Sequence, residues 1–303
     1  MKYAIEIENL TKSYKGFKAV DNLSMHVPEG KVYGFLGMNG AGKTTTIRMI
    51  TGLIRQEKGR IEVFGRNTVK DRLWVARNIG AIVETPGFYE NLTAFENLAI
   101  TTELYNVEKK RIYEVLETVG LSNVGKKKAK EFSLGMKQRL GIANAMVHSP
   151  KMLILDEPTN GLDPSGIKDI REFLRKLACD AGITIMISSH ILSEVQQVAD
   201  FAGIINKGSM LQEIDIHALK AEGQSCLLLE VDKTEKALEI LNNMKLNFQV
   251  DSGKIMVYCS RSMNSSISRN LVSGDIDINS LSPVQKNLED LFLSVVEEGR
   301  VTA

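Results

Sequence analysis

Two short segments of the sequence carry residue types and spacings suited to phosphate chemistry. The first, GMNGAGKTT at residues 37–45, has the spacing GxxxxGK followed by Thr, and it lies between a strand-like run and a helical run. The glycines of such a loop let backbone N–H groups converge on phosphate oxygens, and the N-terminus of the next helix adds a favourable potential for an anion. We therefore predict phosphate contacts from residues across this loop: Gly37, Asn39, Gly40, Ala41, Gly42, Lys43, Thr44 and Thr45.

Lys43 and Thr44 bring a positive charge and a metal-binding oxygen to this loop. A lysine at this position reaches the β- and γ-phosphates of a nucleotide, and the neighbouring hydroxyl binds Mg²⁺. The alternative is a glycine turn that matches the spacing by chance, but such a turn would not need the strand before it and the helix after it. The loop therefore predicts a site for a nucleotide and Mg²⁺.

The second segment, MLILDEP at residues 152–158, places two adjacent carboxylates at the end of an apolar strand-like run. Burying such charges is costly unless a cation or a polar ligand lies nearby. We expect Asp156 to bind Mg²⁺, directly or through another ligand, and Glu157 to orient or deprotonate an attacking water. An ordinary strand end closed by Pro158 is the alternative, and the phosphate-binding loop upstream favours the catalytic interpretation.

The runs around these segments predict the elements that position them. Uninterrupted apolar runs at residues 152–155 and 183–188 indicate strands buried on both faces, and helical patterns at 164–181 and 191–199 separate and follow them. A capping box formed by Thr93 and Glu96 opens a helical stretch. These patterns predict a three-layer α/β domain over residues 1–215, with a helical insert at about residues 93–148.

Residues 216–303 mix strand-like and helical runs. CLLLEVD and KIMVYCS predict strands, and a helix is expected at residues 234–243. A final helix is expected to begin at Ser282, with Pro283 in its first turn and Gln285 completing the cap. This part of the chain is therefore predicted to be a small α+β domain.

Composition narrows the possible classes of protein. The 303 residues include 38 Lys and Arg against 37 Asp and Glu, a balance that gives no indication of nucleic-acid binding. The first residues, MKYAIEIENL, lack the apolar stretch of a secretory signal, and no apolar run approaches the roughly 18 residues needed to cross a bilayer. Three widely spaced cysteines indicate reduced thiols. We expect a protein that stays inside the cell and meets a membrane only through a partner.

Five motifs together resemble those of the nucleotide-binding subunits of ABC transporters. FSLGMKQRLGIANAM at residues 132–146, GLDP at 161–164 and SSH at 188–190 join the two segments above in the order and spacing of that family. The resemblance covers about the first 215 residues and implies a P-loop NTPase fold. It also implies an ATPase that uses ATP and Mg²⁺, forms a head-to-tail dimer with a second copy, and powers a separate multi-span permease from the cytoplasmic face of the membrane.

The resemblance assigns roles at the expected dimer contact. Ser133 and Gly135 match the signature loop that reaches the γ-phosphate of the other subunit's ATP, although Leu134 and Met136 stand where the family usually has Gly and Gln. Because Ser133 and Gly135 keep the hydroxyl and backbone donors, we expect the loop to function. Asp163, in GLDP, is expected at the seam between the two subunits.

Three further positions follow from the resemblance. His190 matches the switch histidine that contacts the γ-phosphate, and Tyr14, in LTKSYKGFKAV, matches the aromatic residue that stacks on adenine. In isolation, either could be an ordinary packing residue. Glu84 stands where the family generally has a Gln that contacts Mg²⁺; a conservative replacement is the alternative, since Glu also binds hard cations.

The cargo is predicted from Glu84 and the PGFYENLTAFENL stretch after it. Both resemble the subgroup that confers self-protection against lantibiotics and resistance to bacitracin. The predicted function is therefore export of antimicrobial peptides, and the alternatives are an exporter motor for a drug, a lipid or a polysaccharide, or a regulatory ATPase without a permease. The single phosphate-binding loop and the short interval to Asp156 exclude tandem translation factors and coiled-coil chromosome ATPases.

Overall fold

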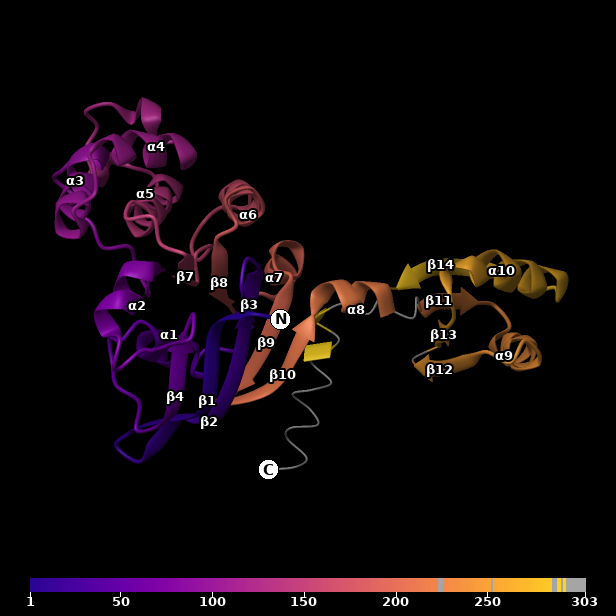
Figure 1. Cartoon of the computed structure of the whole chain (residues 1–303). Helices are drawn as coiled ribbons and strands as arrows, with labels where there is room; N and C mark the ends of the chain where they lie inside the picture. Colours follow the sequence, from indigo (N-terminus) through magenta and orange to yellow (C-terminus); the bar gives the residue numbers. More distant parts are fainter. Residues whose placement is uncertain (223–225, 252, 285–287, 290, 293–303) are drawn as a thin grey trace. The chain divides into compact units, whose positions relative to one another are not determined.

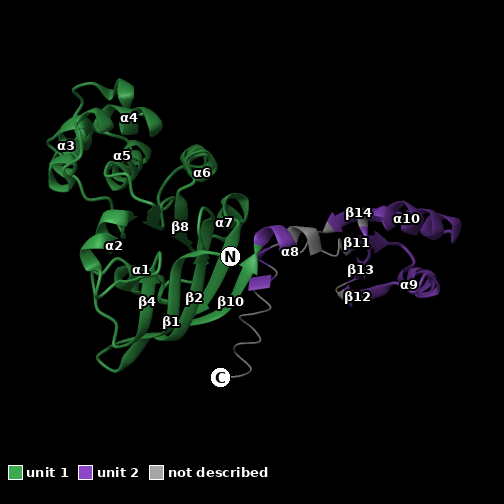
Figure 2. Cartoon of the chain, in the orientation of Figure 1, with its two compact units in different colours: residues 1–215, 295–303 green, residues 216–294 purple. Residues whose placement is uncertain are grey.

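The computed structural model describes residues 1–222, 226–251, 253–284, 288–289 and 291–292. The chain divides into two compact units, Met1–Asp215 with Val295–Ala303 and Ile216–Ser294, and the residues from 293 onward lie outside the described part (Figure 2). No helix in the described part of the chain is both long and apolar enough to cross a membrane.

A six-stranded sheet forms the centre of the first unit (Figure 1). Strands β9, β3, β8, β7 and β6 run parallel, and β10 pairs antiparallel with β9 at one edge. In order across the sheet the strands are β10 (Ser209–Asp215), β9 (Phe201–Asn206), β3 (Val32–Leu36), β8 (Thr184–Ser189), β7 (Met152–Asp156) and β6 (Ile79–Ile82). Because parallel strands end at the same edge, the loops that follow β3, β6, β7 and β8 meet there.

Helices connect these strands, as expected for a P-loop NTPase. Strands β3, β7 and β8 are buried along their whole length, which requires cover on both faces of the sheet. Helix α1 (Lys43–Ile50) follows β3, α6 (Pro164–Ala181) follows β7, and α7 (Leu192–Val198) follows β8. The alternation of strand and helix predicted from the sequence is present.

An antiparallel four-stranded sheet packs with this core. Its order is β2 (Phe17–Pro28), β1 (Tyr3–Tyr14), β4 (Lys58–Val63) and β5 (Arg66–Asn67). One buried apolar cluster contains Ile7 of β1, Phe35 of β3, Ile47 of α1 and Ile154 of β7. Because α1 packs in this cluster, the start of the helix, at the phosphate-binding loop, is held firmly between the two sheets.

The helical insert lies between β6 and β7. It contains α3 (Ala94–Tyr105), α4 (Lys110–Thr118), two 3-10 turns, η1 (Ser122–Val124) and η2 (Ala129–Glu131), and α5 (Leu134–Met146), while α2 (Arg72–Asn78) precedes β6. The predicted capping box is present: Glu96 N–H donates to Thr93 Oγ1 at 3.2 Å, and Thr93 N–H donates to Glu96 Oε2 at 2.8 Å. The insert approaches the sheet closely, since a Cβ on Gly80 of β6 would lie 1.9 Å from the Ala145 carbonyl oxygen of α5.

The second unit is a β-α-β-β-α-β arrangement preceded by α8 (Ile216–Glu222). Its antiparallel sheet has the order β12-β13-β11-β14, and its buried cluster joins the sheet to α9 and α10. Along the chain the elements are β11 (Cys226–Val231), α9 (Thr234–Asn243), β12 (Asn247–Asp251), β13 (Lys254–Tyr258), η3 (Arg261–Met263), α10 (Asn264–Ser273) and β14 (Ile278–Val284).

The predicted start of the final helix is wrong. Ser282 and Pro283 lie in β14, where they pair with Leu228 and Leu227 of β11. Because β14 is an edge strand, it can accept a proline that has no N–H to donate. Gln285 lies outside the described residues. After β14, the first residue described as helical is Leu288.

Candidate functional site

The loop at residues 37–45 joins the end of β3 to the start of α1, and its backbone needs glycine. Gly40 and Gly42 have φ values of 80° and 110°, in the region that side-chain-bearing residues rarely adopt. A Cβ on Gly42 would also lie 2.5 Å from the Ala19 carbonyl oxygen, and one on Gly37 would lie 2.6 Å from that of Ile205. The loop is therefore held tightly against neighbouring strands, with the N-terminus of α1 open behind it.

Lys43 is buried beneath this loop and paired. Its side chain is 6% exposed, and Nζ donates to the Gly37 carbonyl oxygen at 2.7 Å. Nζ also lies 3.2 Å from Glu157 Oε1. A buried ammonium requires such partners, and they place the positive charge beside the phosphate-binding loop.

Asp156, Thr44 and Ser188 form a cluster of oxygen atoms next to Lys43. Asp156 is 2% exposed at the end of β7; its Oδ2 accepts from Thr44 Oγ1 at 2.8 Å, and its Oδ1 accepts from Ser188 Oγ at 2.5 Å. Among the described residues no group of three or more His, Cys, Asp or Glu side chains could hold a metal by itself. One carboxylate and one hydroxyl fit Mg²⁺, which binds proteins through few side chains and takes further oxygens from phosphates and water.

Glu157 lies between a cation and a histidine. Oε1 of Glu157 faces Lys43, and Oε2 lies 2.8 Å from Nδ1 of His190. His190 is the residue that directly follows β8. Its backbone has a φ of 50°, and its N–H donates to Ser188 Oγ at 2.9 Å. Non-glycine residues with positive φ are often found at functional sites, where surrounding contacts compensate the strain. The carboxylate is 20% exposed and thus accessible from the cavity described next.

A cavity of about 470 Å³ contains most of the predicted nucleotide contacts. The predicted loop residues 39–45, Glu157 and His190 line it, whereas Tyr14, Glu84 and Gly37 are not among its lining residues. Four lining residues were not predicted: Phe17, Ala19, Met38 and Asn160. Phe17 could have been found, because it begins the strand after the turn that follows Tyr14, and the two residues pair across the β1–β2 hairpin.

Glu84 lies outside this cavity and pairs with α1. It is two residues beyond the end of β6, at the sheet edge where the other site loops lie. Its backbone φ is 65°, and its Oε1 accepts from Arg48 Nη2 at 2.6 Å. The structure thus brings Glu84 to the correct edge of the sheet but directs its carboxylate to Arg48.

Ser133, Gly135 and Asp163 line a separate cavity of about 590 Å³. Ser133 caps α5 by accepting the Met136 N–H at 3.3 Å, and Asp163 caps α6 by accepting the Gly166 N–H at 3.2 Å. Hydrogen bonds from the Ser165 hydroxyl and the Gly166 N–H lower the pKa of the Asp163 carboxyl below its ordinary value. The signature residues and the phosphate-binding loop of one copy therefore lie in different cavities.

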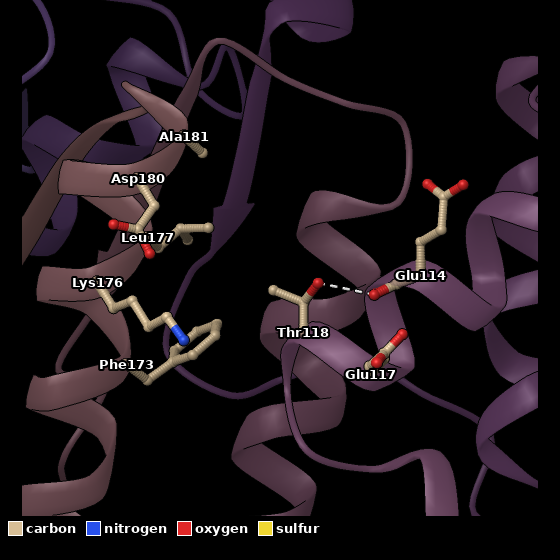
Figure 3. Close-up of a pocket in the computed structure, with 8 residues that line it drawn as sticks. All are labelled: Glu114, Glu117, Thr118, Phe173, Lys176, Leu177, Asp180 and Ala181. Atoms are coloured by element: carbon tan, nitrogen blue, oxygen red, sulfur yellow. Dashed lines mark hydrogen bonds between the residues drawn. The ribbon is translucent and has the colours of Figure 1, made fainter.

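Two further hollows lie in the helical part of this unit. One of about 490 Å³ lies between α4 and α6, and none of its eight lining residues is a predicted site residue (Figure 3). The other, a groove of about 290 Å³, is lined by β6, by the loop after Glu84, and by α3 and α5. In this groove the rings of Tyr105 and His148 stack at 4.2 Å, and burial lowers the pKa of His148.

Comparison with known proteins identifies the family. Residues 20–160 match the model described as ABC transporter. The chain is 46% identical over 308 residues to the bacitracin transport ATP-binding protein BcrA of Bacillus licheniformis, which covers 99% of this chain and 100% of that relative. The chain belongs to the ABC transporter family.

A further relative and a solved structure match most of this ABC subunit but not all of it. The lantibiotic transport ATP-binding protein SrtF of Streptococcus pyogenes is 44% identical over 242 residues, which is 80% of this chain and 97% of that one. A solved ATP-binding cassette, a dimer in a post-hydrolysis state bound to ADP and Pi, matches with a TM-score of 0.64 at 25% identity. That match covers 70% of this chain and 98% of the cassette, so the fold is that of an ABC ATP-binding subunit.

Proposed function

We propose that this chain is the ATP-hydrolysing subunit of an exporter of peptide antibiotics, of the bacitracin or lantibiotic type, that gives immunity or resistance. The observation that carries the hydrolytic part is the position of Glu157, held between Lys43 and His190 at the wall of the nucleotide cavity. The relatives named above, a bacitracin transport and a lantibiotic transport ATP-binding protein, support the cargo.

Within one subunit, the predicted site residues have proposed tasks. The loop N–H groups and Lys43 would bind the phosphates, and Thr44 with Asp156 would hold Mg²⁺, which would supply positive charge to the phosphate oxygens. Glu157 orients the attacking water and accepts its proton. His190 positions the Glu157 carboxylate through the 2.8 Å contact and reaches the γ-phosphate.

The second copy is proposed to complete each site. In one copy, Ser133 and Gly135 lie in a different cavity from the phosphate-binding loop, so they can reach a nucleotide only across a head-to-tail dimer. Asp163 shares their cavity and is placed to lie at the seam. Docking of two half-sites around ATP would convert binding and hydrolysis into closing and opening of the dimer.

The partner in transport is proposed to be a multi-span permease, with this subunit on the cytoplasmic face of the membrane. The groove beside the Glu84 loop suits a short segment of such a permease, because Tyr105, His148 and the exposed Leu104 line it together with Thr85, Pro86 and Gly87 of that loop. A segment bound there would contact the loop that carries Glu84.

Growth inhibition by bacitracin and a lantibiotic panel tests the function. We expect a strain without the gene and a strain carrying only Glu157→Gln to be more sensitive than the parent by a similar factor, since both lack ATP-driven export. Restoring the unaltered gene should restore resistance, and Glu172→Gln, an exposed change on α6, should behave as the parent does. Unchanged sensitivity in both altered strains would contradict the proposed cargo and favour export of a drug, lipid or polysaccharide.

The β1–β2 hairpin is expected to bind adenine through an aromatic ring. Tyr14 remains the prediction from sequence, and Phe17 is the ring that lines the cavity. Stacking on a base contributes about 1–3 kcal/mol, so the variant lacking both rings should lose about that much in ATP affinity. Titration of a fluorescent ATP analogue into Tyr14→Ala, Phe17→Ala and the double variant would assign the contribution of each ring.

Two controls separate stacking from other effects. Tyr113→Ala removes an exposed ring from α4 and should leave ATP affinity unchanged. Inorganic triphosphate lacks a base, so its affinity should not differ among the variants. Unchanged ATP affinity in the double variant would show that the hairpin does not contact adenine.

A further inference from the structure

We propose that Arg48 is a positioning residue that holds Glu84 away from the nucleotide site and competes with nucleotide-bound Mg²⁺ for its carboxylate. This inference rests on the proposed ATP site but not on the cargo. Its first support is the direct contact, in which Arg48 Nη2 donates to Glu84 Oε1 at 2.6 Å. A charge-assisted hydrogen bond of this length fixes the direction of a side chain that is otherwise 58% exposed.

The second support is that the backbone places Glu84 near the metal-binding oxygens, whereas its side chain is directed elsewhere. Glu84 follows β6, and β6 pairs with β7, whose last residue is Asp156. The backbone therefore brings Glu84 to the edge of the sheet where Thr44 and Asp156 supply oxygens. Glu84 is nevertheless not among the residues that line the nucleotide cavity, because Arg48 holds it toward α1.

Charge explains why two arrangements are available to Glu84. Asp156 and Glu157 already bring two carboxylates to this edge, and a third would be repelled by them. A divalent cation reverses that balance, because it attracts carboxylate oxygens more strongly than one guanidinium does. Without Mg²⁺ the Glu84 carboxylate is therefore expected to pair with Arg48. When Mg²⁺ is bound, the ion becomes an alternative partner for the same carboxylate.

The loop that carries Glu84 is packed in a way that would transmit such an exchange. Pro86, two residues further on, contacts α5 so closely that a Cβ on Gly141 would lie 2.5 Å from Pro86 Cβ. Helix α5 begins after Ser133, the first signature residue, and Thr85, Pro86 and Gly87 line the groove assigned to the permease. Movement of Glu84 from Arg48 would therefore shift a loop that contacts both the signature helix and the groove. The strength of the Arg48 pair sets how readily that shift occurs.

The test is the Mg²⁺ requirement for nucleotide binding by the purified full-length chain. A fluorescent ATP analogue at fixed concentration is titrated with Mg²⁺, and the concentration that gives half-maximal binding is measured. In Arg48→Gln we expect this concentration to fall by about two- to fivefold, the range that a partly exposed ion pair can supply. Arg48→Lys keeps a cation and should remain close to the parent. Glu84→Gln removes the carboxylate for which Arg48 and Mg²⁺ compete and should raise the Mg²⁺ requirement.

The double variant separates positioning from a general charge effect. If Arg48 acts through Glu84, Arg48→Gln should cause no further change in the Glu84→Gln background. Arg55→Gln, which removes an exposed positive charge just beyond α1, should leave the requirement unchanged. The inference would be overturned by an unchanged requirement in Arg48→Gln, or by an equal fall in both backgrounds. If the unaltered chain shows no Mg²⁺-dependent nucleotide binding, the proposed ATP site fails and this inference fails with it, whereas resistance measurements bear only on the cargo.

Discussion

Replacing Glu157 with Gln is expected to reduce ATP turnover by about 10²–10⁴-fold, the contribution typical of a positioned general base. The amide keeps the size of the side chain and can still accept from Lys43, but it cannot take a proton from water. ATP binding should persist, because the phosphate-binding loop, Lys43 and Thr44 are unchanged. With hydrolysis blocked, ATP should hold two copies together. Phosphate release and size-exclusion chromatography with and without ATP measure both effects.

Glu172→Gln is the matched control for this prediction. It makes the same chemical change at an exposed site on α6, where Glu172 lies 3.8 Å from Lys168, and it should preserve turnover. Near-normal turnover in Glu157→Gln would disprove the role of Glu157 as the base. Loss of ATP binding in that variant would instead show that Glu157 is needed to build the site.

Replacing Lys43 with Ala is expected to weaken ATP binding strongly and to slow turnover. Hydrogen bonds to charged groups contribute about 1.5–3 kcal/mol, which corresponds to roughly 10- to 100-fold in Kd. The change also removes the partner that lies 3.2 Å from Glu157 Oε1, so the remaining bound ATP should be hydrolysed slowly. Titration with a fluorescent ATP analogue and phosphate release at saturating ATP separate the two losses.

The control for Lys43 is Lys168→Ala, in which the lysine removed is 66% exposed on α6. Its ATP affinity and turnover should match the parent. Unfolding midpoints of both variants should be compared, since Lys43 is buried and its removal leaves the Gly37 carbonyl oxygen without this donor. Parental ATP affinity in Lys43→Ala, with the fold intact, would contradict the assignment of the phosphate-binding loop.

Local patterns predicted the central part of the fold well. The apolar runs at residues 152–155 and 183–188 form β7 and β8, and the Thr93 capping box begins α3, because each of these signals acts within a few residues. The helix expected at Ser282 was wrong for the opposite reason. Ser followed by Pro has the local form of a helix start, but pairing with β11, more than fifty residues earlier in the chain, makes this segment a strand.

In the candidate site, too, the features set by local motifs were predicted, and those set by contacts between distant segments were not. Lys43, Thr44, Asp156, Glu157 and His190 lie together in the structure, as expected from motifs at strand ends. The sequence offers both Tyr14 and Phe17 as aromatic candidates in this hairpin, but which of the two rings lines the cavity depends on how the hairpin directs its side chains. The Arg48 partner of Glu84 was also not predicted, because the contact joins a helix to a loop 36 residues later.

The sequence by itself supplied the chemical groups on which the proposals rest: those expected to bind phosphate and Mg²⁺, and the carboxylate expected to act on water. It also determined the order of strands and helices, since those signals are local. Only the tertiary structure decided which groups share a cavity. The sheet order brings the ends of β3, β8 and β7 side by side, while the signature residues of the same copy lie in a different cavity. Long-range pairing and packing control that arrangement, so it emerges only when the whole unit has folded.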